Sequence, residues 1–295
     1  MIEVKNLTKV YKNGKGVFNL NFSIKKGEVL GFLGPNGAGK TTTIRNLLGF
    51  IKPDSGYTKI KGLNSWENSS EIQKYLGYIP GETAFFDEMT GFEFLEFIGK
   101  LRNLRDTTKR DELINRLELD TSIKIRRMSK GMKQKIALIT AFMHDPEILI
   151  LDEPTSGLDP LMQNLFIEFI KEEKQKGKTI LMSSHNFEEV ERTCDRVAII
   201  NNGKIVAVEE ISKLKAAQQK KYLVRVASKK DVKTIKNSNL NIELIDALTL
   251  SITIQNNYND FINTLAKCNI TDIDTISQSL EEIFLDYYRK ENNND

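Results

Sequence analysis

The stretch that decides the fold is a glycine-rich loop that reads Gly34-Pro35-Asn36-Gly37-Ala38-Gly39-Lys40-Thr41. A short apolar run from Glu28 to Leu33 precedes it and is typical of a buried strand, and the segment from Thr41 to Leu48 predicts a helix. The first N–H groups of a helix have no partner within the helix, so this loop turns them toward an anion. The pattern is that of a phosphate-binding loop.

Two side chains of the loop complete this interpretation. Lys40 would bring a positive charge to the β- and γ-phosphates of a nucleotide, and Thr41 would offer its hydroxyl to Mg²⁺. Thr42, the next residue, is included among the expected nucleotide-binding residues. A glycine-rich turn that only caps a helix is the alternative, and the strand before the loop and the helix after it disfavour this alternative.

An acidic pair ends a second buried strand. The apolar run from Ile148 to Leu151 is followed by Asp152 and Glu153. Adjacent carboxylates at the carboxyl end of a buried parallel strand are costly unless they serve a charge, which a magnesium nucleotide supplies. We expect Asp152 to hold Mg²⁺ together with Thr41, and Glu153 to polarise the attacking water. A surface acidic pair after a strand is the alternative.

Three further positions could contact a nucleotide. His185 follows the predicted strand from Thr179 to Ser183, at the sheet edge where such folds bind ligands. Ser129 and Gly131 precede a helix predicted from Lys135 to His144, so they could form a second anion site or a simple N-cap.

Asp159 and Tyr11 each have two interpretations. Asp159 with Pro160 is a sound cap for a helix predicted from Leu161 to Lys176, with or without a further role. Tyr11 ends the first predicted strand, where its ring could stack on a base or be half-buried in a hairpin.

Length and composition limit the remaining possibilities. A chain of 295 residues suggests about two domains. We expect a cytosolic protein, because no apolar stretch approaches a membrane span and the start does not resemble a signal peptide. Cys194 and Cys268 match no ligand spacing and are expected to be reduced thiols. The net charge of +3 gives no reason to expect nucleic acid; the basic excess in residues 100–135 fits a solvated face or a surface toward anionic lipid or an acidic partner.

In this order the motifs resemble those of the ATP-binding subunit of ATP-binding cassette (ABC) transporters, over about residues 1–215. By this resemblance, Gly34 to Thr41 match the Walker A loop and Ser129 to Gln134 the signature motif. The remaining matches are Tyr11 to the adenine-stacking aromatic, Asp152 and Glu153 to the Walker B pair, Asp159 to the D-loop aspartate and His185 to the switch histidine.

The resemblance also implies an architecture. We expect an α/β P-loop NTPase fold, namely the ABC cassette, with a parallel core sheet, an antiparallel β edge and a helical insert at about residues 81–145. Residues 216–295 fall outside the cassette and predict a small C-terminal α+β domain, with strands at 222–227 and 248–254 and helices at 261–267 and 280–289.

This chain departs from the family pattern at two places. The family usually has Gln where this chain reads Gly81 and then Glu82, so Glu82 could act through a water, or the contact could be missing. The signature usually reads Leu-Ser-Gly-Gly-Gln, whereas here it reads Met128-Ser129-Lys130-Gly131-Met132. Lys130 adds a charge whose effect on the rate the sequence does not indicate.

The function implied by the resemblance is hydrolysis of ATP, with Mg²⁺, to energise export through a separate integral-membrane permease. Each ATP would lie between the Walker A loop of one subunit and the signature motif of a second ATP-binding subunit, either an identical chain or a sister subunit. Such a protein would be peripheral on the inner face of the cell membrane. The alternatives are a soluble ABC ATPase that acts on the ribosome or DNA, and a P-loop kinase, which would leave the signature and His185 unexplained.

Overall fold

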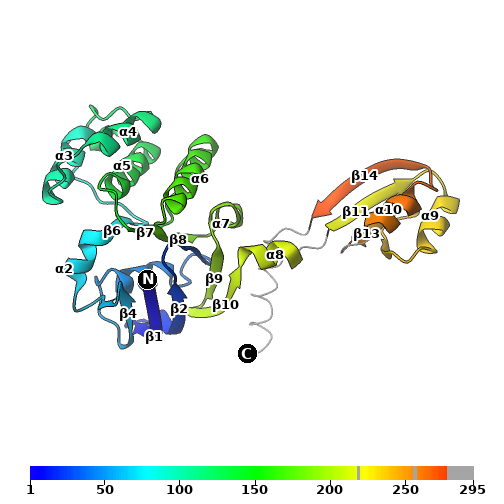
Figure 1. The fold of residues 1–295 in the computed structure, drawn as a ribbon, viewed down its shortest axis with the longest axis horizontal. Helices are drawn as coiled ribbons and strands as arrows, with labels where there is room; N and C mark the ends of the chain where they lie inside the picture. The colour runs from blue at the N-terminus through cyan, green and yellow to red at the C-terminus, as the bar shows by residue number, and fades with distance from the viewer. Residues whose placement is uncertain (218–219, 255–257, 278–295) are drawn as a thin grey trace. The chain divides into compact units, whose positions relative to one another are not determined.

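The computed structural model describes residues 1–217, 220–254 and 258–277 (Figure 1). The chain divides into two compact units, Met1–Ile211 and Ser212–Asp295. Each unit has its own hydrophobic core, and each is described below by itself.

The first unit is built on a six-stranded sheet with the order β10-β9-β3-β8-β7-β6. The strands from β9 to β6 are parallel, and β10 pairs with β9 in the antiparallel sense. All residues of the three central strands are buried, which explains why their sequences are continuous apolar runs. The strands are β3 (Val29–Leu33), β6 (Leu76–Ile79), β7 (Ile148–Asp152), β8 (Thr179–Ser184), β9 (Arg196–Asn201) and β10 (Lys204–Glu210).

A second, antiparallel sheet has the order β2-β1-β4-β5, which confirms the expected β edge. Its strands are β1 (Ile2–Val10), β2 (Gly16–Ile24), β4 (Ser55–Ile60) and β5 (Leu63–Asn64). Helix α1 (Lys40–Leu47) shares one core with both sheets, because Ile44 and Leu47 belong to the same buried cluster as Leu7 and Phe32. This packing fixes the loop that precedes α1.

The helical insert contains three main helices, which lie together in Figure 1. They are α3 (Gly91–Leu101), α4 (Thr108–Arg116) and α5 (Lys130–Phe142). Three helices of the first unit lie outside the insert in the sequence: the short α2 (Ser69–Ile72) before it, and α6 (Pro160–Gln175) and α7 (Phe187–Thr193) after it. A capping box between Thr90 and Glu93 starts α3. Helix α5 begins five residues earlier than predicted, because the side chain of Ser129 caps it.

The second unit contains a four-stranded antiparallel sheet with the order β12-β13-β11-β14. Its elements follow the split β-α-β-β-α-β arrangement, which confirms the predicted α+β character. They are β11 (Lys220–Val226), α9 (Lys229–Lys236), β12 (Asn241–Leu244), β13 (Thr249–Ile254), α10 (Tyr258–Leu265) and β14 (Ile270–Ser277); α8 (Ile211–Ala217) spans the boundary between the units. The helix predicted at 280–289 lies outside the described residues.

No described helix combines the length and the apolar character that a membrane crossing requires.

Candidate functional site

The glycine-rich loop joins β3 to α1 and wraps around the ammonium group of Lys40. Lys40 Nζ donates hydrogen bonds to the carbonyl oxygens of Gly34, at 2.6 Å, and Pro35, at 3.2 Å, and its side chain is 5% exposed. Gly39 has a φ of +111°, and a Cβ there would lie 2.6 Å from Val17. Glycine is therefore required at this position for both its conformation and its close packing.

Asp152 lies at the end of β7, buried beside the start of α1. Its Oδ2 accepts a hydrogen bond from Thr41 Oγ1 at 2.8 Å, and its Oδ1 accepts one from Ser183 Oγ at the end of β8. A carboxylate and a hydroxyl are the hard oxygen donors that Mg²⁺ takes alongside substrate phosphates. No cluster of three or more His, Cys, Asp or Glu side chains with metal-binding geometry occurs among the described residues.

Glu153 lies between two cationic or ionisable side chains. Its Oε1 is 3.2 Å from Lys40 Nζ, and its Oε2 is 3.4 Å from His185 Nδ1. Its backbone has a φ of +48°, a left-handed conformation that is rare for a residue with a Cβ. The Glu153 N–H donates to the carbonyl oxygen of Ser183 at 3.2 Å and to Ser183 Oγ at 3.0 Å, which holds this turn. The structure thus brings Lys40, Glu153 and His185 together from three segments.

A cavity of about 320 Å³ opens over the loop. Tyr11, which is 38% exposed, lies at this cavity together with Thr42 and Glu153. The other lining residues include three that sequence reasoning missed, namely Asn13, Lys15 and Gly16. These residues belong to the turn after β1, which was predicted only as a connection between two strands; its position beside the glycine-rich loop could have indicated a role in binding.

Eight predicted site residues are not among the residues that line this cavity, namely Gly34, Pro35, Ala38, Ser129, Gly131, Asp152, Asp159 and His185. Ser129 Oγ accepts a hydrogen bond from the Met132 N–H at the start of α5, and Asp159 Oδ1 accepts one from the Met162 N–H at the start of α6. Both therefore act as N-caps, as the simpler interpretation predicted. Gly131 lies close to the carbonyl oxygen of Gly157, to which a Cβ on Gly131 would approach within 3.2 Å.

The first departure from the family pattern lies beside the acidic pair. A Cβ on Gly81 would lie 3.2 Å from Asp152 Oδ2, so the backbone passes close to this carboxylate. Glu82 is exposed.

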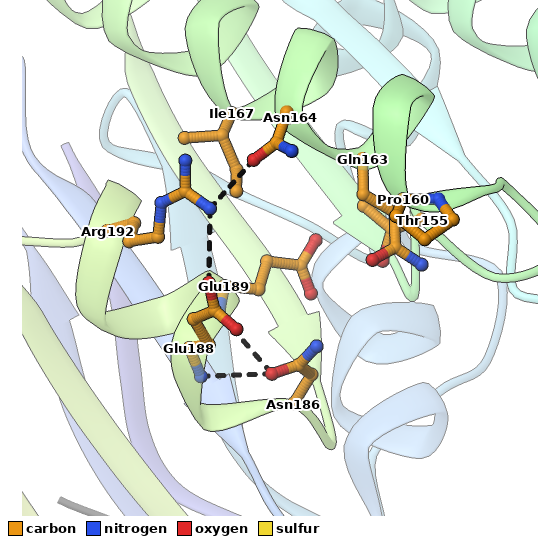
Figure 2. Close-up of a pocket in the computed structure, with 9 residues that line it drawn as sticks. All are labelled: Thr155, Pro160, Gln163, Asn164, Ile167, Asn186, Glu188, Glu189 and Arg192. Atoms are coloured by element: carbon orange, nitrogen blue, oxygen red, sulfur yellow. Dashed lines mark hydrogen bonds and ion pairs between the residues drawn. The ribbon is translucent and has the colours of Figure 1, made fainter.

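A second cavity, of about 120 Å³, lies between the starts of α6 and α7 (Figure 2). Arg192 reaches across it and donates to Asn164 on α6 at 2.8 Å and to Glu188 on α7 at 3.2 Å. Glu189 is 3% exposed at this place, and its Oε2 accepts a hydrogen bond from Ser184 Oγ. Burial raises the pKa of Glu189, although hydrogen bonds from Ser184 and Thr155 oppose the shift.

The fold and the loop together define a P-loop nucleotide-binding α/β protein. A family model described as ABC transporter matches residues 17–156. The bacitracin transport ATP-binding protein BcrA of Bacillus licheniformis is 40% identical over 229 residues, which cover 76% of this chain and 74% of that protein. The linearmycin resistance ATP-binding protein LnrL of Bacillus subtilis is 38% identical over 213 residues, covering 70% of this chain and 68% of that protein.

Solved structures agree with these relatives. The ATP-binding subunit of an ABC transporter has a TM-score of 0.67 and 31% identity, and covers 73% of this chain and 92% of that one. The dimeric bacterial ABC transporter cassette MJ0796 has a TM-score of 0.63 and 25% identity, and covers 72% of this chain and 99% of that one. The chain belongs to the ATP-binding subunits of ABC transporters, and it is an ATPase.

Proposed function

We propose that this subunit hydrolyses magnesium ATP at the cavity over the glycine-rich loop and thereby energises export through a separate permease. The observation that carries the proposal is that Glu153 lies 3.2 Å from Lys40 and 3.4 Å from His185, beside the hydrogen-bonded pair of Thr41 and Asp152. Phosphoryl transfer to water needs a cation, a base and a polar contact at the γ-phosphate.

Each side chain at the site would have a separate role in ATP binding or hydrolysis. Lys40 would neutralise the phosphate charge, and Tyr11 would stack on the adenine ring. Mg²⁺, held by Thr41 and Asp152, would bind phosphate oxygens and offset the charge that develops on them. Glu153 would accept the proton of the attacking water, whose oxygen bonds to the γ-phosphorus as the bond to the bridging β–γ oxygen breaks. His185 would donate to the γ-phosphate.

We propose that a second chain completes the site. Ser129 and Asp159 are exposed and Gly131 is half-buried, and all three lie away from the cavity lining, where a second subunit could use them. The N-terminus of α5, capped by Ser129, favours an anion. The related cassette MJ0796 is dimeric. The partner subunit is proposed to be an identical chain or a sister subunit.

The proposed direction of transport and cellular location rest on relatives. BcrA is described as a bacitracin transport protein and LnrL as a linearmycin resistance protein, which suits the removal of compounds from the cell. We place this chain on the inner face of the membrane, bound to an integral-membrane permease. A soluble ABC ATPase would fractionate in the same way with or without a co-expressed permease, whereas this chain should move to membranes only with one.

We also propose that residues 1–215 form the nucleotide-binding domain, with the helical insert at about 81–145, and that residues 216–295 form an accessory domain. The two separate hydrophobic cores support this division. The compact units meet at Ile211 and Ser212, within four residues of the proposed boundary.

The test of the ATP site is Lys40→Ala, which removes the charge that the loop surrounds. ATP affinity, measured with a fluorescent analogue, should fall by at least about tenfold, and hydrolysis should be lost, because Lys40 supplies the ammonium group that the loop surrounds. Lys100→Ala is the control, since Lys100 is an exposed lysine on α3 that pairs only with Glu96 among its described ion pairs. A folded Lys40→Ala protein with near-normal turnover would refute the proposed site.

A further inference from the structure

The second departure from the family pattern makes a contact within the chain. Lys130, the first residue of α5, donates from Nζ to Ser156 Oγ at 3.1 Å. Ser156 belongs to the turn that follows the acidic pair and leads to α6. The charge added at Lys130 therefore reaches a hydroxyl of the same subunit.

The carbon stem of Lys130 lies against the next residue of that turn. Gly157 has a φ of +83°, and a Cβ at this position would lie 2.9 Å from Lys130 Cγ and Cδ. Glycine is needed there both for the left-handed backbone and for the space that the lysine stem fills. The contact thus combines a hydrogen bond with close packing.

Two further contacts join the same segments. Gln134 Nε2, one turn along α5, donates to the carbonyl oxygen of Pro154 at 2.6 Å in a buried position. Gly131 approaches the carbonyl oxygen of Gly157, as described above. The start of α5 is therefore joined to residues 154–157 along its first turn and a half, and Pro154 directly follows Glu153.

We propose that Lys130 is a positioning residue that fastens the signature loop (Ser129–Gly131) to the D-loop (Ser156–Asp159) of the same chain. This inference rests on the proposed function, in which the signature loop contacts ATP held by the second subunit. A displacement of the signature loop by that ATP is transmitted through the Lys130 contact and Pro154 to Glu153. Binding of ATP at one site then aligns the base at the other.

The expected result is a loss of coupling without a loss of ATP binding. Lys130→Met keeps the stem and removes the charge, and Ser156→Ala removes the acceptor. Each should lower kcat by about fivefold, the effect of one lost hydrogen bond, and lower the Hill coefficient for ATP toward 1. The Kd of ATP for the isolated chain at low protein concentration should stay unchanged.

The double variant tests whether the two side chains act through each other. Lys130→Met with Ser156→Ala should reduce kcat no further than either single change, because both remove the same contact. Lys130→Arg should retain most of the activity, since its guanidinium can donate to the same hydroxyl. Lys100→Met on α3 is the control for the loss of one exposed positive charge. Thermal unfolding of each variant separates a coupling defect from a folding defect.

Three outcomes would overturn the inference. Parental kcat in Lys130→Met would remove the contact from the mechanism. A large effect of Lys130→Met with none in Ser156→Ala would show that the charge acts directly on the partner's ATP. Multiplying effects in the double variant would show two independent roles. None of these outcomes would contradict the proposed function, which has its own test: it is refuted if the Lys40→Ala variant still hydrolyses ATP.

Discussion

Glu153 is unusual in both its backbone conformation and the contacts of its side chain. It has a left-handed backbone and a carboxylate held between Lys40 and His185. A left-handed conformation in a residue with a Cβ costs about 1–3 kcal/mol and persists only where the surroundings hold it, here through two hydrogen bonds to Ser183. The carboxylate of this residue lies 3.2 Å from Lys40 and lines the cavity over the glycine-rich loop.

The variant Glu153→Gln tests the proposed base. Glutamine keeps the shape and a hydrogen-bonding group but cannot accept the proton of the attacking water. Hydrolysis should fall by at least about 100-fold, while ATP binding survives because Lys40 and Thr41 are unchanged. Single-turnover hydrolysis and analogue binding are the two measurements.

The matched control is Glu147→Gln. Glu147 directly precedes β7, and Glu153 directly follows it. Glu147 forms an exposed ion pair with Lys61 and lies outside the cavity lining. The Glu147→Gln variant should hydrolyse ATP at the parental rate. Parental hydrolysis in Glu153→Gln as well would show that another group activates the water.

Glu189 predicts a dependence of stability on pH. Burial raises its pKa above the ordinary value of 4.5, so the native state keeps this proton at pH values where the unfolded chain has released it. The free energy of unfolding then falls as the pH rises through this window. Glu189→Gln keeps the hydrogen bond with Ser184 and cannot ionise, so it should raise the Tm at pH 8 and have no such advantage near pH 4.

The comparison for Glu189 is its neighbour Glu188, whose side chain is 73% exposed. Glu188→Gln should change the free energy of unfolding by less than about 0.5 kcal/mol at either pH, as is usual for a surface site. A stabilising effect of Glu189→Gln that grows toward low pH would have the opposite sign and would contradict the buried-acid interpretation.

At this scale the sequence predicted the residues that follow a strong pattern. Lys40 and Thr41 stand in a spaced glycine motif, and Asp152 and Glu153 end an apolar run, so their meeting at one sheet edge could be expected. Glu189 could not be found in this way. Its burial depends on α6 and α7 packing together, and a glutamate in a helix is usually exposed.

At the scale of elements, a charged cluster joins the helical insert to the core. Arg116 on α4 makes two hydrogen bonds to Glu172 on α6 and lies 4.1 Å from the ring centroid of Phe169. Next to it, Glu173 is almost completely buried with Lys178, and Lys109 of α4 reaches the same carboxylate. Glu172 thus holds a partly exposed ion pair, whereas the buried Glu173 pairs with more than one lysine.

Replacing each glutamate by glutamine separates these contributions. Glu173→Gln leaves the buried Lys178 without one of its carboxylates and should cost about 3 kcal/mol of the free energy of unfolding. Glu172→Gln breaks a partly exposed pair and should cost no more than about 1 kcal/mol. Urea unfolding followed by circular dichroism measures both. Equal costs would show that burial does not decide the strength of these contacts.

The elements that the sequence did not predict lie in both units; they include α2, β5, α7, β9 and β10 in the first and α9, β12 and β14 in the second. Strand β14 contains Asp272 and Asp274, a residue type that is depleted in strands. Pairing places Asp272 opposite Arg225 of β11, and this cross-strand charge pair compensates for the low propensity. Such compensation comes from a partner 47 positions earlier in the chain, and local patterns do not contain it.

At the scale of the whole chain, the two hydrophobic cores draw on different parts of the sequence. Among the described residues, the buried members of the cluster that contains Phe32 end at Ile200, with Ile205 and Val208 packed against them, and the cluster that contains Val224 draws on residues beyond these. None of the proposed phosphate-handling residues lies in the second unit. Each core should therefore form without the other.

A chain of residues 1–215 tests this independence. It should bind an ATP analogue with a Kd within about threefold of the full chain, because the glycine-rich loop and its supporting core are complete in it. Calorimetry of the full chain should resolve two unfolding transitions, since multidomain chains commonly depart from two-state behaviour, and the shortened chain should lose one of them. A folded 1–215 chain that binds no nucleotide would mean that the second unit supports the ATP site, against the separation of the two cores.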